Sequence, residues 1–193
     1  GQHFAPTRRH DIGARSLRGL MDSRPHICAA SQADAAQIAE IYAHHVAHGT
    51  ASFDTVPRSV EETIAKIEDC HANGWPFLVA TDRTTVLGYA YASPFRPRLA
   101  FRYCLEDSIY LAPDAQGQGV GTLLLAELLA RCEAAGARQM LAVIGDSQNL
   151  GSIGLHRRLG FEPAGLLRSA GWKFDRWLDV VLMQKSLGAG GST

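Results

Sequence analysis

The feature of this sequence that most restricts its fold is a glycine cluster placed directly before a leucine-rich run. The glycines are Gly117, Gly119 and Gly121. The run has the spacing of an amphipathic helix, with an apolar stripe made of Val120, Leu123, Leu124, Leu128 and Cys132. A glycine cluster that opens such a helix lets bare backbone N–H groups approach an anion. The segment therefore predicts an anion-binding loop, with a glycine-rich turn that merely starts a core helix as the alternative.

The rest of the chain predicts short elements in the order β-α-α-β-β-β-α-β-α-β-β. Two capping boxes, Ser31 with Asp34 and Ser59 with Glu62, mark the starts of the first two helices. The expected helices cover residues 33–49, 60–74, 120–136 and 149–160. The expected strands cover residues 26–31, 77–82, 86–95, 105–113, 138–146, 161–168 and 171–187, the last two around a turn. This order predicts an α/β (α+β) fold with a mixed, mostly antiparallel central sheet and helices on both faces.

Composition limits the function classes. Lys+Arg and Asp+Glu are both 19, and this balance argues against a nucleic-acid-binding protein. No apolar run approaches the ~20 residues that cross a bilayer, so no membrane partner is expected. The four scattered cysteines indicate reduced thiols in a cytoplasmic protein.

The length of 193 residues fits one domain, which we expect at residues 25–187, before a short tail at 188–193. Residues 1–24 differ in character and carry five arginines against two aspartates. They lack the apolar region of a secretory signal, so we expect a leader or an added extension, with Met21 as a possible natural start.

Three phosphate-binding patterns compete for the glycine cluster. A Walker A loop needs a lysine after the last glycine, and none is present. A dinucleotide fingerprint needs a third glycine where Thr122 stands. The third pattern, [Q/R]-x-x-G-x-[G/A], matches Gln116 to Gly121, with a strand before it and a long helix after it.

This third pattern resembles the pyrophosphate loop of the GCN5-related N-acetyltransferases, the GNAT superfamily. The resemblance implies the GNAT fold, acetyl-CoA as co-substrate and no metal. It also implies an asparagine and a small residue beside the pantetheine, matched by Asn149 and Ser152, and backbone N–H groups of the strand at 109–111 directed at the thioester oxygen. The implied cofactor-binding residues are Ile109, Tyr110, Leu111, Gln116, Gly117, Gln118, Gly119, Val120, Gly121, Thr122, Asn149 and Ser152.

Longer segments resemble one group within that superfamily, the phosphinothricin N-acetyltransferases. They are "HGTASFDTVPRSVEE", "GWPFLVA", "GYAYASPFRPRLAFRYCLEDSIYL" and "GWKFDRWLDVVLMQKSL". The resemblance covers about residues 24–187. It implies a small-molecule amine acceptor, namely phosphinothricin, methionine sulfone or methionine sulfoximine, and a homodimer with Trp172, Lys173, Phe174 and Trp177 at its interface.

The chemistry requires a proton acceptor, because an α-amino group has a pKa of about 8 and attacks a thioester only when it is neutral. Alternation along the strand at 105–111 puts Glu106, Ser108 and Tyr110 on one face and Asp107 on the other. The resemblance places Glu106 beside the acetyl group as the general base, with Asp107 as the competing carboxylate. Many members have a tyrosine that protonates the leaving thiolate at the position of His156, so His156 is the candidate general acid, and the identity of that acid stays open.

An anionic acceptor also needs hydrogen-bond donors. Arginines at 96, 98 and 102 offer guanidinium groups, which bind oxyanions in bidentate fashion, and the resemblance assigns Arg96 and Arg98 to the substrate pocket. The full set of expected substrate-binding residues is Phe53, Trp75, Arg96, Arg98, Glu106, Asp107 and Ser108. The histidines of "AHHVAHG" contain an i, i+4 pair, but no third metal ligand is obvious, so we expect a polar helix face and no metal.

Two other functions remain open. The first is a GNAT enzyme with a different acceptor, such as a protein N-terminus, a polyamine or an aminoglycoside. The second is a non-catalytic acetyl-CoA sensor that regulates a partner. Neutral net charge and the arginine cluster favour a small anionic acceptor, and a sensor needs no base such as Glu106.

Overall fold

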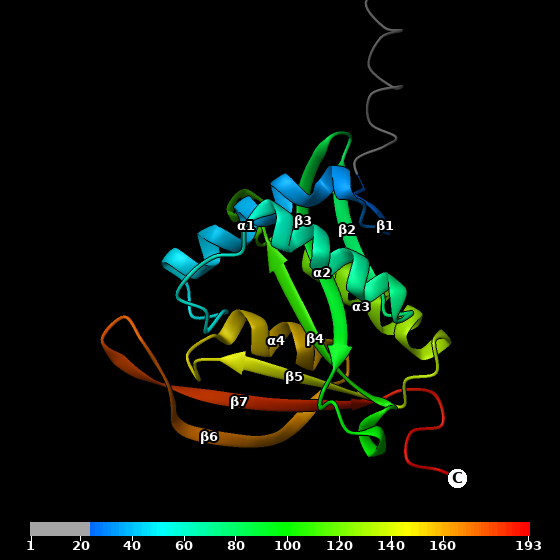
Figure 1. The fold of residues 1–193 in the computed structure, drawn as a ribbon. Helices are drawn as coiled ribbons and strands as arrows, with labels where there is room; N and C mark the ends of the chain where they lie inside the picture. The colour runs from blue at the N-terminus through cyan, green and yellow to red at the C-terminus, as the bar shows by residue number, and fades with distance from the viewer. Residues whose placement is uncertain (1–23) are drawn as a thin grey trace, which may run out of the picture.

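The computed structural model describes residues 24–193, and the expected leader falls almost entirely outside this range. Seven strands form one sheet in the order β1-β2-β3-β4-β5-β7-β6 (Figure 1). Their bounds are β1 (His26–Ala29), β2 (Phe77–Asp82), β3 (Thr85–Pro94), β4 (Cys104–Leu111), β5 (Gln139–Gly145), β6 (Glu162–Lys173) and β7 (Arg176–Ser186). The β4–β5 pair is parallel and the other pairs are antiparallel, which confirms the predicted mixed, mostly antiparallel sheet.

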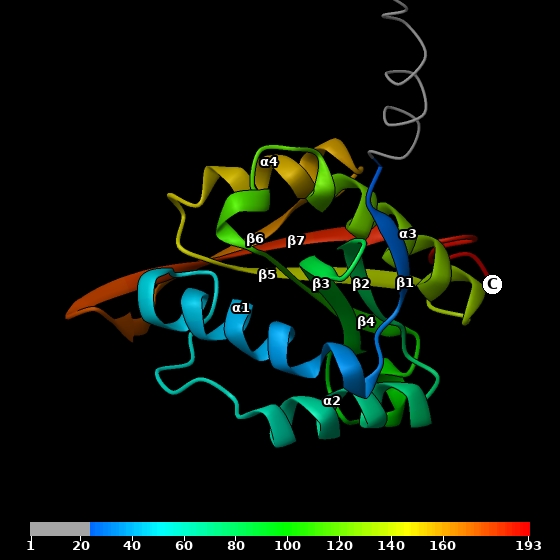
Figure 2. The ribbon, with the colours of Figure 1, turned by 90° about the horizontal axis from the view of Figure 1, so that it is seen from above.

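Within residues 24–193, four α-helices cover the sheet from both faces, as the sequence predicts. They are α1 (Ala35–His48), α2 (Val60–Ala72), α3 (Val120–Ala134) and α4 (Leu150–Arg158). Figure 2 shows α1 and α2 on one side of the sheet and α3 and α4 on the other. Both predicted capping boxes are present at Ser31 and Ser59. Within residues 24–193, none of the helices combines the length and the apolar character that a membrane crossing needs.

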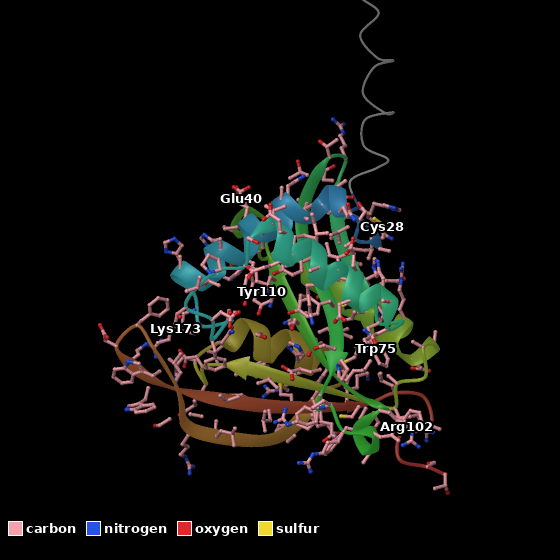
Figure 3. All side chains as sticks on the ribbon, in the orientation of Figure 1. Cys28, Glu40, Trp75, Arg102, Tyr110 and Lys173 are labelled. Carbon is pink, nitrogen blue, oxygen red and sulfur yellow. The ribbon has the colours of Figure 1, made fainter. Side chains whose placement is uncertain are left out.

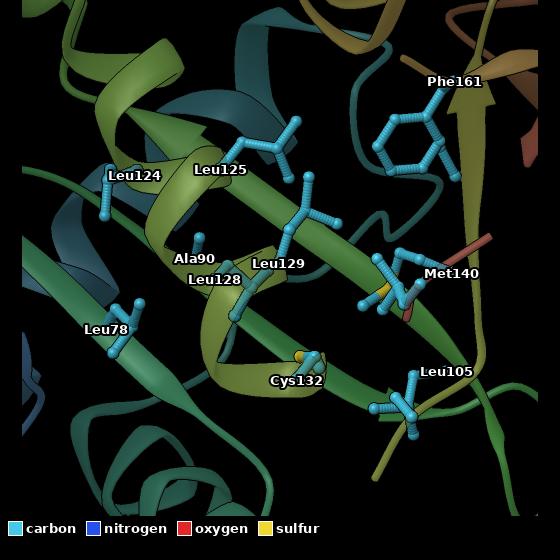
Figure 4. Close-up of a cluster of buried hydrophobic side chains, with 14 of the residues drawn as sticks. Leu78, Ala90, Leu105, Leu124, Leu125, Leu128, Leu129, Cys132, Met140 and Phe161 are labelled. Atoms are coloured by element: carbon cyan, nitrogen blue, oxygen red, sulfur yellow. The ribbon is translucent and has the colours of Figure 1, made fainter. Parts of the chain in front are cut away.

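Each face of the sheet has its own hydrophobic cluster, because alternate residues of a strand point to opposite faces. Along β2, Leu78 and Ala80 belong to the cluster under α3, whereas Phe77 and Val79 belong to the cluster under α1 and α2. Figure 4 shows the leucines of α3 facing Leu105 of β4 and Met140 of β5. Both of these strands are thereby anchored from the α3 side.

The structure corrects two details of the sequence analysis. Leu123 is exposed, and the buried stripe of α3 consists of Val120, Gly121, Leu124, Leu125, Leu128, Leu129 and Cys132. The last hairpin turns at Phe174 and Asp175, not before Gly171, so residues 171–173 end β6. The chain after Ser186 forms turns without a helix or strand.

Candidate active site

The site lies where β4 and β5 separate. The two strands pair only from Cys104 to Asp107 on β4, whereas β5 continues to pair with β7 up to Gly145. From Ser108 onward, the edge of β4 that faces β5 therefore has no ladder partner. Two adjoining hollows open there, a cavity of about 210 Å³ and a groove of about 490 Å³. Both are lined by Ala51, Ile109, Tyr110, Asn149 and Ser152.

The groove runs over the glycine loop at the N-terminus of α3. Gly117 and Gly119 have φ angles of 72° and 82°, a left-handed backbone that glycine adopts without strain, and a Cβ at either position would meet no atom within 4 Å. Gly119 is the N-cap of α3, and no side chain caps this helix. The N–H groups of its first turn therefore have no intrahelical partner, and they lie at the positive end of the helix dipole.

The predicted loop residues contribute to this groove in different ways. Gln116, Gly117, Gly119, Gly121 and Thr122 line it directly. Gln118 turns its amide back to the carbonyl oxygen of Asp114 at 2.7 Å, and the side chain of Val120 is buried in the core. Gln118 and Val120 thus belong to the predicted segment, but neither of them lines the groove.

The first turn of α4 separates the groove from the cavity. Asn149 is the N-cap of α4, and its Oδ1 accepts a hydrogen bond from the backbone N–H of Ser152 at 3.3 Å. This cap holds Ser152 in place on the wall between the two hollows. Leu111 of β4 lines the groove from the other side, and its carbonyl oxygen lies 2.7 Å from Nε2 of His45 on α1.

Glu106 lines the cavity without a hydrogen-bond partner in residues 24–193, and Ser108 lines it from the same face of β4. Burial, followed by the negative charge of Asp107, raises the pKa of Glu106, and the positive charge of Arg96 opposes this rise. A half-buried carboxylate with a raised pKa and free lone pairs can accept a proton from a group in the cavity.

Asp107 is engaged differently from Glu106. Its Oδ2 lies 2.8 Å from Nε2 of His156, and both side chains are buried. Nδ1 of His156 lies 2.7 Å from the carbonyl oxygen of Ser152 and 3.4 Å from its Oγ. Burial by itself lowers the pKa of His156, but the hydrogen bond to Asp107, the charge of Asp107 and the Ser152 carbonyl outweigh it, so the pKa is raised overall.

The expected substrate-binding residues do not all meet at the cavity. Phe53 lines it and packs against Gly145 and Gly171. Trp75 lines neither hollow and instead packs, partly buried, against both hydrophobic clusters (Figure 3). Trp75 therefore belongs to the core of the fold.

The three arginines of the loop after β3 also lie outside the two hollows. Arg96 is close enough to lower the pKa of Glu106, and its guanidinium stacks on Phe95 at 4.2 Å. Arg98 is exposed at the start of a short 3-10 helix, Leu99–Phe101. Arg102 stacks on Tyr103 at 4.5 Å. Of the three, Arg96 has the clearest electrostatic link to the cavity.

Lys173 lies inside the protomer, and the expectation of an interface position for it is wrong. Its Nζ donates hydrogen bonds to the carbonyl oxygens of Gly49 at 2.9 Å and Ser52 at 2.7 Å. Burial lowers the pKa of Lys173, and the charge of Asp54 opposes this change. Lys173 thus fastens the loop after α1, which lines the cavity, to the end of β6.

The histidines of α1 take part in packing and hydrogen bonding. The ring of His44 contacts the rings of His45 and His48, and the ring of His45 hydrogen-bonds to the Leu111 carbonyl oxygen. In the part of the chain that the structure describes, no group of three or more His, Cys, Asp or Glu side chains is placed to hold a metal ion.

Polar residues that the sequence analysis did not single out also line the cavity, among them Tyr42, Ser52 and Asp54. The Tyr42 hydroxyl donates to the Asp54 carboxylate and lies 2.9 Å from Oγ of Ser52. Ser52 and Asp54 lie in the loop after α1, which has no periodic pattern, and only the packing of that loop onto β4 and β5 brings them to the cavity. Tyr42 comes from the buried face of α1.

Comparison with known proteins agrees with this geometry. The model of the acetyltransferase (GNAT) family matches residues 38–161. The phosphinothricin N-acetyltransferase of Alcaligenes faecalis is 53% identical over 160 residues, which cover 83% of this chain and 81% of that protein. The L-methionine sulfoximine/L-methionine sulfone acetyltransferase of Pseudomonas aeruginosa is 42% identical over 159 residues. These residues cover 82% of this chain and 92% of that protein.

A solved structure gives the same answer. The crystal structure of a GNAT superfamily phosphinothricin acetyltransferase from Sinorhizobium meliloti, in complex with acetyl-CoA, superposes with a TM-score of 0.85 at 47% identity. The match covers 88% of this chain and 92% of the chain from Sinorhizobium meliloti. On the family model, the identities and the fold together, this chain belongs to the acetyltransferase (GNAT) family.

Proposed function

We propose that the protein transfers an acetyl group from acetyl-CoA to the α-amino group of a small amino-acid analogue such as phosphinothricin, methionine sulfone or methionine sulfoximine. The observation that carries this proposal is the direct junction of two hollows. One lies over the uncapped N-terminus of α3, and the other contains the unpartnered Glu106. The names of the relatives supply the acceptor class.

The groove fits acetyl-CoA, which supplies the acetyl thioester. The free N–H groups at the start of α3 suit the pyrophosphate, since a helix N-terminus favours negative charge. The unpaired edge of β4 from Ile109 to Leu111 offers backbone donors for the thioester oxygen. Asn149 and Ser152 lie beside the point where the groove meets the cavity.

Glu106 acts as the general base. An α-ammonium group must lose a proton before its nitrogen can attack, and Glu106 is the carboxylate of the cavity that has no hydrogen-bond partner among the described residues. Asp107, the competing carboxylate, already binds His156. The cavity also contains Asp54, so its walls favour a cationic amine.

The anionic end of the acceptor then needs a cation at the mouth of the cavity, and we assign this role to Arg96, with Arg98 as a second donor. Arg96→Ala should raise KM for methionine sulfone by about 10- to 100-fold, because hydrogen bonds to charged groups contribute about 1.5–3 kcal/mol each. The measurement is steady-state kinetics at saturating acetyl-CoA.

Arg102→Ala is the matched control for this prediction. It removes a guanidinium that, like that of Arg96, stacks on a neighbouring ring and donates to a carbonyl oxygen of the same loop, but only Arg96 acts on the pKa of Glu106. Equal effects of the two substitutions would show that the loop itself, and not a contact of Arg96, sets KM.

The protein also presents a surface suited to a second copy of itself. β6 is an edge strand, and the hairpin that it forms with β7 exposes Leu166, Leu167, Trp172, Phe174 and Trp177. The rings of Trp172 and Trp177 pack edge to face at 5.1 Å, 55% and 61% exposed. Apolar edge strands of this kind favour association, so we propose a homodimer through this hairpin, bordering the site through Phe53 and Gly171.

A double substitution, Trp172→Ser with Trp177→Ser, should halve the mass in sedimentation velocity. Each substitution removes a large apolar area from the proposed interface and leaves the core of the protomer unchanged, because both tryptophans are exposed. Leu123→Ser provides a control, because Leu123 is exposed on the outer side of α3. A wild-type protein with the mass of a single chain at micromolar concentration would contradict the dimer.

The proposed function is tested by thiol release from acetyl-CoA with a panel of acceptors. The panel contains phosphinothricin, methionine sulfone, methionine sulfoximine, ordinary amino acids, spermidine, an aminoglycoside and an N-terminal peptide. Turnover confined to the first three supports the proposal. Turnover with spermidine or the peptide identifies another acceptor class, and tight acetyl-CoA binding without any turnover identifies a sensor.

We further propose a cytoplasmic setting, in which acetylation of phosphinothricin would give antibiotic resistance. All four cysteines are free thiols, and such thiols suit a reducing compartment.

A further inference from the structure

The buried pair Asp107 and His156 raises a question about proton delivery. His156 is only 2% exposed, and both of its ring nitrogens already bind protein atoms, Nε2 to Asp107 and Nδ1 to Ser152. The ring therefore has no free nitrogen to present to a reacting atom in the cavity. If His156 supplies a proton, another group has to carry it.

The hydrogen-bond partners fix where the protons of this pair lie. The carbonyl oxygen of Ser152 can only accept, so Nδ1 of His156 must carry a hydrogen. The contact between Nε2 and Asp107 Oδ2, 2.8 Å long, then holds one further proton. Because both ring nitrogens face acceptor oxygens, we take the pair as an imidazolium bound to a carboxylate, and the raised pKa of His156 agrees with this.

Ser152 is the group that connects this pair to the reacting centre. Its Oγ lies 3.4 Å from Nδ1 of His156, and Ser152 lines both the groove and the cavity. Because Nδ1 carries a hydrogen, Oγ accepts at this contact and keeps its own hydrogen. Among residues 24–193, Ser152 Oγ makes no other hydrogen bond, so the hydroxyl hydrogen is free to point into the hollow.

We propose that the Ser152 hydroxyl delivers the proton to the departing thiolate, and that His156, held by Asp107, replaces it. This inference rests on the proposed acetyl transfer. As the carbon–sulfur bond breaks, the Oγ–H proton passes to sulfur and the Nδ1–H proton of His156 passes to Oγ. The imidazolium becomes a neutral imidazole whose Nε2–H still donates to Asp107, so charge and protons balance.

Asp107 acts here as a positioning residue. Its Oδ1 is buried without a partner in the described chain, so its negative charge is directed mainly at His156. The other titratable groups near the pair are Glu106 on the same strand and Cys132 on α3. Burial, and then the charge of Asp107, raise the pKa of Cys132 to about 12, so this thiol stays neutral.

The kinetic test uses acetyl-CoA and methionine sulfone with Ser152→Ala, His156→Asn and the double variant. Each single substitution should lower kcat by about 10²-fold, with KM for acetyl-CoA within about threefold, because only proton transfer is lost. The double variant should be no slower than the slower single variant. Ser147→Ala is the control, since this serine of the loop before α4 donates a hydrogen bond to Asp179 at 3.2 Å and should retain kcat. Full activity of Ser152→Ala, or losses that multiply in the double variant, would overturn the relay.

The second test follows the proton itself by ¹⁵N NMR, with the His156 signals identified by their loss in His156→Asn. In the wild type we expect a hydrogen on Nδ1 and a His156 pKa above its ordinary value. This pKa should fall in Asp107→Asn, because only the Ser152 carbonyl then opposes the effect of burial. The high-pH fall of kcat should move to lower pH in the same variant.

A purely structural role for Asp107 would lower the melting temperature and leave both the His156 titration and the kcat profile unmoved, which would refute the inference. The NMR experiment needs no turnover. It therefore separates failure of the relay from failure of the proposed function, which the acceptor panel tests with wild-type protein.

Discussion

Replacing Glu106 with glutamine is expected to lower kcat for methionine sulfone by about 10²–10⁴-fold, the usual contribution of a general base. Acetyl-CoA affinity should change little, because Glu106 lines the cavity and not the groove over α3. Kinetics gives the first quantity and isothermal titration calorimetry the second. Glu106→Asp should recover part of the loss, since it keeps a carboxylate on the same face of β4.

The pH dependence should change in the same variant. As the proposed base, Glu106 would work only when it is ionised, and burial together with the charge of Asp107 raises its pKa above the ordinary 4.5. Wild-type kcat should therefore fall as the pH falls through this raised pKa, and Glu106→Gln should lose that fall. Glu40 is an exposed carboxylate on α1 (Figure 3), and Glu40→Gln should have the same pH dependence as the wild type. An unchanged acidic limb in Glu106→Gln would assign the base to another group.

The second large effect is expected at Gly145, the last residue of β5. A Cβ on Gly145 would lie 2.0 Å from the carbonyl oxygen of Thr50 and 3.3 Å from the ring of Phe53. Gly145→Ala must therefore push away the loop that carries Ala51 to Asp54 along the cavity. Overpacking of this kind costs about 1–3 kcal/mol. We expect a melting temperature roughly 2–12 °C lower, together with a raised KM for the acceptor.

Gly165→Ala separates this clash from the general effect of adding a methyl group to a strand. Gly165 lies in β6, where a Cβ would meet Leu182 at an ordinary distance of 3.7 Å. The melting temperature and the acceptor KM of Gly165→Ala should stay close to those of the wild type. A Gly145→Ala protein with unchanged stability and KM would mean that the loop after α1 yields freely and does not shape the cavity.

Local interactions account for the parts of the structure that the sequence predicted well. The capping boxes at Ser31 and Ser59 span three residues each, and the glycine loop is continuous in the chain, so their residue types suffice to identify them. The mixed, mostly antiparallel sheet followed from the element order and the family resemblance. The Leu123 error arose because neighbouring helical positions differ by about 100°, and the chain gives no sign of which edge of a broad stripe meets the sheet.

Contacts between distant segments explain what the sequence could not give. Gly171 looks like a turn residue, but it lies in β6 because the Phe53 ring occupies the space of its side chain, with Cε1 2.5 Å from an ideal Cβ. The turn instead uses Phe174 and Asp175 at φ angles of 55° and 56°, and a phenylalanine is not a residue type that indicates a turn. The Asp107–His156 pair joins residues 49 positions apart, and no local pattern records such a contact.

Lys173 ties the loop after α1 to the end of β6, and this contact sets when the cavity is completed during synthesis. The loop that it holds leaves the ribosome early, but Lys173 follows Ser52 by 121 residues. At about 5–20 residues per second, that interval lasts roughly 6–24 s. A nascent chain can complete the glycine loop and α3 while the acceptor cavity still lacks a fixed wall. On the proposed function, the cavity for the acceptor is therefore completed only when the last hairpin has emerged.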